Sequence, residues 1–111
     1  PGIAMDLRGR DMSVGPYRLT FRLQGGTKGG GELFYTTDLK TILPKGERIE
    51  FSVDADGKWH DIDLRLPTKQ RIYQLRLDVG EGVSKAIVSG LTLLDSAGKR
   101  VITWAQPKND K

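Results

Sequence analysis

The sequence contains no cysteine, only one histidine and only two tryptophans in 111 residues. Without cysteine, a disulfide scaffold and every thiolate chemistry are excluded, whether nucleophilic, redox or zinc-binding. An acid–base or nucleophilic site needs a base, an orienting partner and a nucleophile, and this composition supplies little of that material. A carboxylate pair of the glycosidase type stays open as an alternative, but no two carboxylates stand out. We therefore predict a protein that is not an enzyme and has no catalytic residues and no cofactor.

Long apolar runs are also missing. None approaches the roughly 20 residues that span a bilayer, and the opening PGIAMDLRGR shows no signal peptide. We expect no membrane partner. Either the protein is cytoplasmic or it is a piece of a longer one, and a start at Pro-Gly rather than Met favours an excised fragment.

Charge of one sign is not concentrated anywhere in the chain. Lys and Arg number 18 against 14 Asp and Glu, which gives a formal charge of +4. Nucleic-acid binders usually gather basic residues on one face or one helix, whereas these are scattered and alternate with apolar residues. We expect no nucleic-acid partner, and polyanion binding is kept only as a second alternative.

What is present is alternation of apolar and polar residues with a period of two, which is typical of half-buried antiparallel strands. The clean cases are YRLTFRL (17–23), RIEFSV (48–53), HDIDLRL (60–66) and YQLRLDV (73–79). Further strands are expected at IAMDL (3–7), GELFYT (31–36) and RVITW (100–104), and at AIVSGLTLL (86–94), which is apolar on both sides as a central strand covered twice would be. Only TTDLKTILPKG (36–46) is a helical candidate, of a turn or two at most.

Glycine- and proline-rich breaks separate these runs at short intervals. About eight short strands with such punctuation indicate an all-β fold, an antiparallel β-sandwich or jelly roll. We expect a single domain over residues 1–111.

The stretch DADGKWHDIDLRLP (54–67) holds the only histidine, His60, and one tryptophan, Trp59. DADG resembles the start of a calcium loop, but the further ligands and the closing glutamate of that motif are missing, so a hairpin turn is expected and no metal site. A calcium ion held by distant loops stays open, with carboxylates available at Asp6, Asp11, Asp38, Asp78 and Glu81. His60 is in phase with Ile62 and Leu64, so we expect it to face inward and to make a structural hydrogen bond.

Trp59 is in phase with the polar side of the same strand, and an indole outside the core is informative. Sugars stack their C–H faces on flat aromatic rings while their hydroxyls find polar neighbours. Tyr35 and Phe34, beside the glycine-rich loop 25–31, are further candidates for carbohydrate binding. The alternative for Trp59 is that it folds over the end of the sandwich and seals the core.

DGKWHDIDLRLP (56–67), IYQLRLDVGEG (72–82) and AIVSGLTLLDSAGKRV (86–101), in this order, resemble a β-sandwich module of secreted bacterial polysaccharide-degrading enzymes. The module is the galactose-binding-like accessory domain found beside sulfatase and glycoside hydrolase catalytic domains. GELFYTT (31–37) is similar to an upstream strand of that family. The resemblance covers residues 20 to 104 and departs at Val79, where the family usually has proline.

The resemblance implies a non-catalytic accessory module of an exported carbohydrate-active enzyme, located outside the cell or in the periplasm. Its expected partners are a weakly bound carbohydrate and the catalytic domain of the same polypeptide. The alternative is a docking domain that packs on the catalytic domain and has no ligand of its own. In that case AIVSGLTLL (86–94) is the segment expected to carry an exposed apolar patch.

Overall fold

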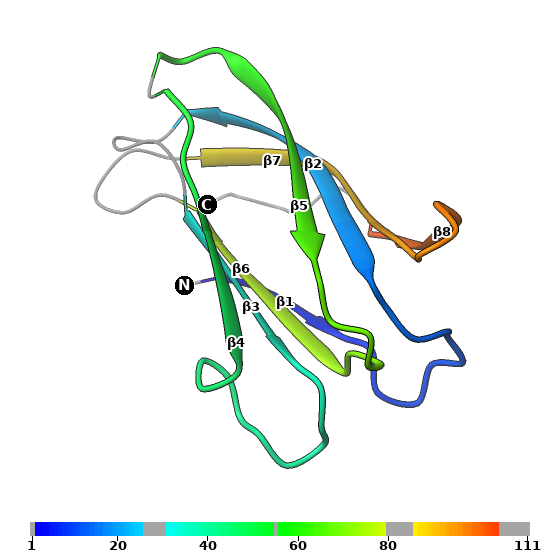
Figure 1. Cartoon of the computed structure of the whole chain (residues 1–111). Helices are drawn as coiled ribbons and strands as arrows, with labels where there is room; N and C mark the ends of the chain where they lie inside the picture. The colour runs from blue at the N-terminus through cyan, green and yellow to red at the C-terminus, as the bar shows by residue number, and fades with distance from the viewer. Residues whose placement is uncertain (1, 26–30, 55, 80–85, 105–111) are drawn as a thin grey trace.

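The structure is a computed structural model, and it describes residues 2–25, 31–54, 56–79 and 86–104. These residues form eight strands in two antiparallel four-stranded sheets that pack face to face (Figure 1), and they contain no helix. The predicted all-β fold, an antiparallel β-sandwich, is therefore confirmed. The same residues provide no helix with the length and apolar character needed to span a membrane.

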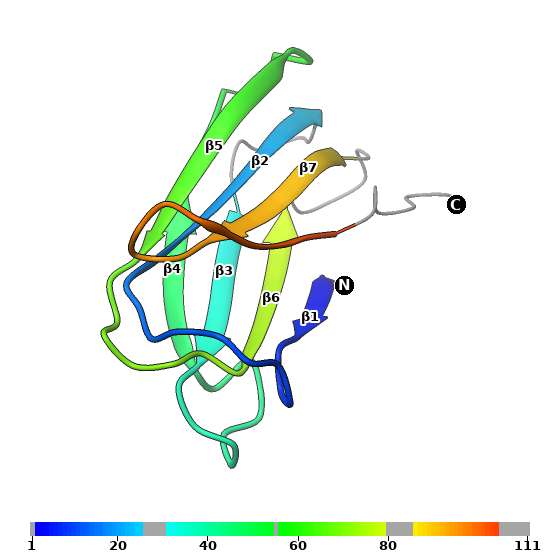
Figure 2. The ribbon, with the colours of Figure 1, turned by 90° about the vertical axis from the view of Figure 1, so that its right-hand side faces the viewer.

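Each sheet combines strands that are far apart in the sequence. Figure 2 shows the strands of each sheet side by side. The first sheet has the order β1 (Ile3–Asp6), β6 (Gln74–Val79), β3 (Gly31–Thr36), β4 (Glu47–Phe51). The second has the order β5 (Trp59–Leu66), β2 (Tyr17–Gly25), β7 (Ala86–Leu94), β8 (Arg100–Thr103).

The core lies between the two sheets and consists of the apolar residues that the period-two pattern places on one side of each strand. The phase predicted for β2 and β5 is confirmed, because their polar positions face away from the first sheet. Phe21 and Phe51 meet across the sandwich with ring centroids 5.9 Å apart, edge to face. The fully buried residues include Leu19, Leu33, Leu66, Leu75, Leu77, Val88, Leu91 and Leu93.

β7 contradicts the expectation of a strand covered on both sides. Thr20 of β2 pairs with Thr92, but Arg22 pairs with Ser89, so the pairing slips at Gly90. Gly90 has φ +68°, the left-handed conformation of glycine in a common type of β-bulge. The extra residue restores the phase, so Val88 and Leu91 both face the core. The outward positions are mixed, because Ser89 and Thr92 alternate with Ile87 and Leu94, and of the two apolar residues Ile87 is exposed while Leu94 is half-buried.

Residues 52–54 and 56–58 belong to the connection between β4 and β5, and this connection does not close the predicted hairpin. β4 and β5 lie at the edges of different sheets, and the segment carries the chain from one sheet to the other (Figure 1). Gly57 adopts φ +75°, and Asp56 Oδ1 accepts a hydrogen bond from the Lys58 amide at 3.0 Å. The Asp-Gly pair therefore acts as a turn between sheets, because its own side-chain hydrogen bond fixes the bend without a facing strand.

The helical turn considered for residues 36–46 is absent. Asp38 Oδ1 accepts hydrogen bonds from the amides of Lys40 and Thr41 at 2.8 and 2.7 Å. This local pattern offers the backbone an alternative to helix formation. The resulting loop leaves Leu39 and Ile42 exposed.

The long loop before β2 is held in place by Arg71. Its guanidinium donates to the carbonyl of Leu7 at 3.0 Å, to that of Ile72 at 2.7 Å and to that of Arg10. The same group lies 4.5 Å from the centroid of the Tyr73 ring. One side chain thereby satisfies three carbonyls of segments that have no strand partners there.

Candidate functional site

The outer face of the second sheet gathers an exposed aromatic ring, charged side chains and hydroxyl groups. We call it the polar sheet face. It is formed by the outward side chains of the four neighbouring strands β5, β2, β7 and β8. Its members are Trp59, Asp61, Asp63, Arg65, Arg18, Thr20, Arg22, Gln24, Ile87, Ser89, Thr92, Leu94 and Thr103.

The antiparallel register arranges these side chains in rows across the strands. Asp61 lies opposite Arg22, and Asp63 lies opposite Thr20. The row of Asp63 and Thr20 continues through Thr92 to Thr103. The hydroxyl oxygens of Thr92 and Thr103 are 3.3 Å apart. The face thus offers a band of hydroxyl groups between charged side chains.

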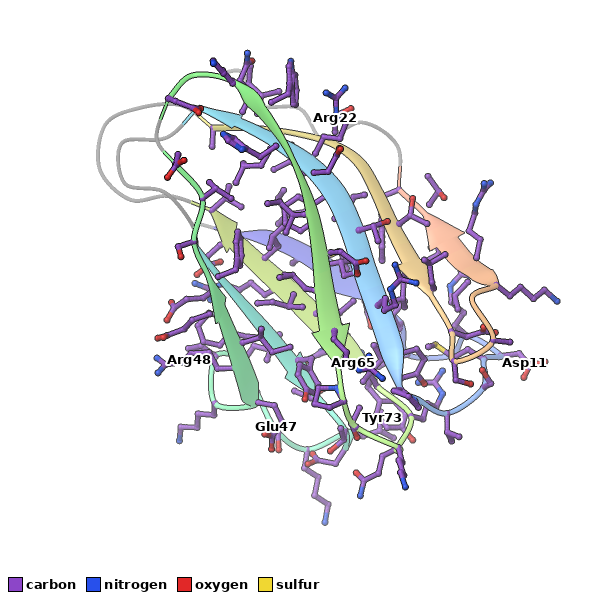
Figure 3. All side chains as sticks on the ribbon, turned by 45° about the horizontal axis from the view of Figure 1, so that its top comes forward. Asp11, Arg22, Glu47, Arg48, Arg65 and Tyr73 are labelled. Atoms are coloured by element: carbon purple, nitrogen blue, oxygen red, sulfur yellow. The ribbon has the colours of Figure 1, made fainter. Side chains whose placement is uncertain are left out.

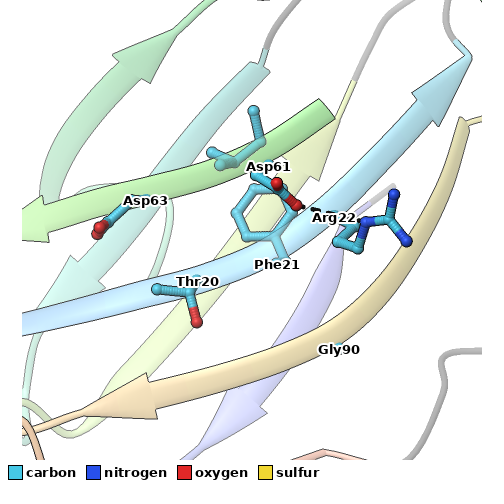
Figure 4. Close-up of a pocket in the computed structure, with 7 residues that line it drawn as sticks. Thr20, Phe21, Arg22, Asp61, Asp63 and Gly90 are labelled. Atoms are coloured by element: carbon cyan, nitrogen blue, oxygen red, sulfur yellow. Dashed lines mark ion pairs between the residues drawn. The ribbon is translucent and has the colours of Figure 1, made fainter. Parts of the chain in front are cut away.

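The two ion pairs on this face differ in how tightly they are made. Arg18 engages Asp63 at two points, with Nε donating to Oδ1 at 3.0 Å and Nη2 donating to Oδ2. This hydrogen bonding lowers the pKa of Asp63 below its usual value. Arg22 touches Asp61 only through Nε at 3.3 Å, and the Asp61 side chain is 90% exposed. In Figure 4 the terminal nitrogens of Arg22 point away from Asp61.

Trp59 stands at the end of the face, on the first residue of β5, and 37% of it is exposed. The Arg22 guanidinium carbon lies 5.1 Å from the centroid of the indole ring, a cation–π distance. Gln24, directly opposite Trp59, donates to the Gly57 carbonyl at 3.1 Å. The indole is therefore on the polar face as predicted, with Arg22 against its ring and Gln24 opposite it on β2.

A shallow depression of about 320 Å³ lies beside Arg22 (Figure 4). The bulge creates it, because Gly90 places no side chain where β7 passes β2, and a Cβ at that position would meet nothing within 4 Å. The lining residues are Thr20, Phe21, Arg22, Asp61, Ile62, Asp63 and Gly90.

His60 is half-buried and shares the inward phase of Ile62 and Leu64, as the sequence predicted. Its Nε2 lies 2.8 Å from Asp56 Oδ1, which confirms the predicted hydrogen bond at the start of the strand. That bond and the Lys58 amide lower the pKa of the Asp56 carboxyl below its ordinary value. The pair closes the turn before β5 and faces away from the polar sheet face.

The other two candidate binding residues are not brought together with Trp59. Tyr35 is 4% exposed and belongs to the core, while Phe34 is 8% exposed on the outer face of the first sheet. The Arg76 guanidinium carbon lies 5.7 Å from the centroid of the Phe34 ring. Neither residue presents an open ring face in this conformation, so of the three aromatic candidates only Trp59 can offer a stacking surface.

The carboxylates considered for calcium are also separate. Asp6 is paired with Arg8, Asp78 is paired with Arg76, and Asp38 caps its own loop. Within the described ranges, no three or more metal-ligating side chains cluster. Glu81 lies outside the described residues.

The contact between Trp59 and Arg22 could not be predicted from the sequence. Arg22 and Asp61 were recognised as polar positions of their strands, but the alternation does not reveal which strands are neighbours. Comparison with family models, with curated proteins and with solved structures finds no match. The site is therefore interpreted from its own geometry.

Proposed function

We propose that this protein is a non-catalytic carbohydrate-binding module and that the polar sheet face is its binding surface. The observation that carries the proposal is the exposed Trp59 ring beside Arg22, on the same face as a row of threonine hydroxyls that begins at Thr20. An apolar ring bordered by hydrogen-bonding groups complements a sugar, which has C–H faces and a rim of hydroxyls.

The geometry also supports weak affinity. The face is open, with one stacking ring and one shallow depression, so a bound sugar buries little surface. Weak single-site binding suits an accessory module that holds an enzyme near a polymeric substrate. We extend the proposal to this role, in an exported enzyme of the sulfatase or glycoside hydrolase kind, on the resemblance of segments 56–67, 72–82 and 86–101.

Affinity electrophoresis against a panel of soluble polysaccharides tests the binding function. The protein should be retarded by at least one glycan, and Trp59→Ala should weaken that retardation about tenfold, or about 1.4 kcal/mol. Ile42→Ala is the matched control, because it removes an exposed apolar side chain far from the face. Retardation by no glycan, or retardation unchanged by Trp59→Ala, would contradict the proposal.

A docking role is the second candidate, and one observation favours it. Leu39 and Ile42 are exposed on a loop that Asp38 holds in a fixed shape. Exposed aliphatic groups on an ordered loop can pack against a catalytic domain of the same polypeptide. Amide hydrogen exchange in residues 37–46 should then be slower in the full-length enzyme than in the isolated module. Equal exchange would remove this candidate.

A further inference from the structure

Two arginines on the polar sheet face are not neutralised by their neighbours. Arg22 makes a single contact with a carboxylate that stays almost fully in water. The Arg65 side chain makes no hydrogen bond or ion pair within the described part of the chain, and contributes only a longer-range attraction to Asp63. Both guanidinium groups therefore keep donors that a ligand can use.

The register adds a second, independent observation. Arg65 lies directly opposite Arg18 in the antiparallel pair. Like charges at directly opposed positions are unfavourable, and Asp63 is already engaged at two points by Arg18. The outward positions of β2 and β5 hold three arginines and two aspartates, so their net charge is +1. An anion beside Arg65 would relieve this repulsion.

We propose that the ligand of this face is an acidic glycan, whose carboxylate or sulfate groups bind Arg22 and Arg65. The inference rests on the proposed carbohydrate-binding function and names the class of carbohydrate. A guanidinium presents paired N–H donors that match the oxygens of a carboxylate or sulfate. The contact with Trp59 holds Arg22 in place, so its donor edge is presented to an anion beside the stacking ring.

The spacing of the two arginines sets the length of the ligand. Arg65 is four residues from Asp61, the partner of Arg22, so the two points are about 13 Å apart along the strand. Figure 3 shows Arg22 and Arg65 towards opposite ends of the face. The hydroxyl row of Thr20, Thr92 and Thr103 crosses between them. A charged oligosaccharide, rather than a single sugar, is the expected occupant.

The matched probes are polygalacturonate and its methyl ester, which share a backbone and differ in charge, with ι-carrageenan and unsulfated agarose as the sulfate pair. A single-stranded oligonucleotide tests for general polyanion binding. The protein should bind an acidic member at least about tenfold more tightly than its neutral partner, because a charge-assisted pair is lost in the latter. Binding should also weaken several-fold when salt rises from about 50 to 200 mM.

The variants Arg22→Gln and Arg65→Gln locate the contacts. Arg65→Gln should weaken binding to the acidic glycan while binding to its neutral partner stays unchanged. Arg22→Gln should weaken binding to the acidic glycan more than binding to the neutral one, because Arg22 also contacts the Trp59 ring. Arg48→Gln is the control, because its side chain is as exposed as that of Arg22, at 55% against 56%, but lies on the other sheet. Figure 3 shows the separation of the two residues.

The outcomes separate the two claims. Equal binding of acidic and neutral glycans, insensitive to Arg22→Gln, overturns this inference and leaves the carbohydrate-binding function standing. Oligonucleotide binding as tight as that of the acidic glycan, or an equal loss in Arg48→Gln, also overturns it, since charge alone would then drive association. Binding to no glycan removes the proposed function itself.

Discussion

Trp59 and His60 are adjacent in sequence and yet belong to different parts of the molecule. The strand turns the indole to the polar sheet face and the imidazole towards Asp56. Their replacement should therefore have opposite consequences. His60→Ala removes a half-buried ring together with its hydrogen bond to Asp56, and it should lower the free energy of unfolding by about 1–2 kcal/mol, with ligand affinity unchanged.

Trp59→Ala is the matched variant for this test. It should leave stability within about 0.5 kcal/mol, because the side chain is an exposed one at the strand end. Denaturant unfolding and glycan titration of both variants check the pair of expectations. If His60→Ala kept full stability and abolished binding, the imidazole would be part of the site.

Arg71 provides a second prediction at this scale. Arg71→Met keeps most of the apolar stem but removes the donors to the carbonyls of Leu7, Arg10 and Ile72. The free energy of unfolding should fall by about 1–3 kcal/mol, because three acceptors, two of them in partly buried hydrogen bonds, lose their partner. Arg100→Met, at the exposed start of β8, is the control and should change it by less than about 0.5 kcal/mol. Equal stability of the two variants would mean that the loop does not depend on Arg71.

At the scale of elements, Gly90 is an insertion that the strand accommodates with a bulge. If Gly90 is taken out, the remaining run Val-Ser-Leu-Thr-Leu alternates without interruption, with Val88, Leu91 and Leu93 inward. Deletion of Gly90 should therefore preserve the fold, with a loss of less than about 1 kcal/mol, and should fill in the depression beside Arg22. Glycan affinity should fall.

Deletion of Thr92 is the contrasting change. It also shortens β7 by one residue, but it keeps the bulge, turns Leu93 away from the core and moves Leu94 into its place. The pairing with β8 then slips by one residue, so the free energy of unfolding should fall by more than in the Gly90 deletion. Circular dichroism and thermal melts distinguish the two deletions. If both were equally destabilised, the bulge would be required by the sheet and not merely tolerated.

The eight strands were predictable because alternation is a local property of the sequence. The bounds of β3 and β7 agree with the segments GELFYT and AIVSGLTLL. The predictions that were wrong concern features that depend on contacts between residues far apart in the sequence. The apolar content of β7 was assigned to two covered faces because a single glycine was not recognised as a bulge, and the Asp56-Gly57 turn was assigned to a hairpin because the sheet change is invisible locally.

The candidate site was only partly predictable for the same reason. Phase alone placed Trp59 outside the core. It could not show that Arg22 would lie over the indole, since that depends on the pairing of β2 with β5 across 33 intervening residues. Nor could it show that Phe34 and Tyr35 would both be buried, because the coverage of the first sheet is a property of the assembled sandwich.

At the scale of the whole molecule, stability should depend on pH through several partnered carboxylates. Arg8 lowers the pKa of Asp6 to about 2, Thr41 lowers that of Asp38, and His60 lowers that of Asp56. A pKa that is lower in the folded state gives a contribution that is present above the unfolded value of 3.8 and is lost as pH falls through the folded value. The free energy of unfolding should therefore decrease between about pH 4 and pH 2.

Urea unfolding at a series of pH values measures this dependence. Asp6→Asn should show a smaller loss between about pH 4 and pH 2 than the unaltered protein, because one of the titrating groups is gone. Asp11→Asn is the control, because Asp11 is an exposed carboxylate in the loop that follows β1. A free energy of unfolding that is the same at pH 7 and pH 2 would contradict the account.

The central claim is that the polar sheet face binds a glycan. Titration of the isotope-labelled protein with a galacturonic acid oligosaccharide, followed by backbone and indole N–H chemical shifts, tests it most directly. If this face binds the glycan, the largest shifts fall on the Trp59 indole and on Thr20, Arg22, Asp61 and Arg65, with the first sheet unchanged. Shifts confined to β3 and β4, or to the loop at residues 37–46, would contradict it.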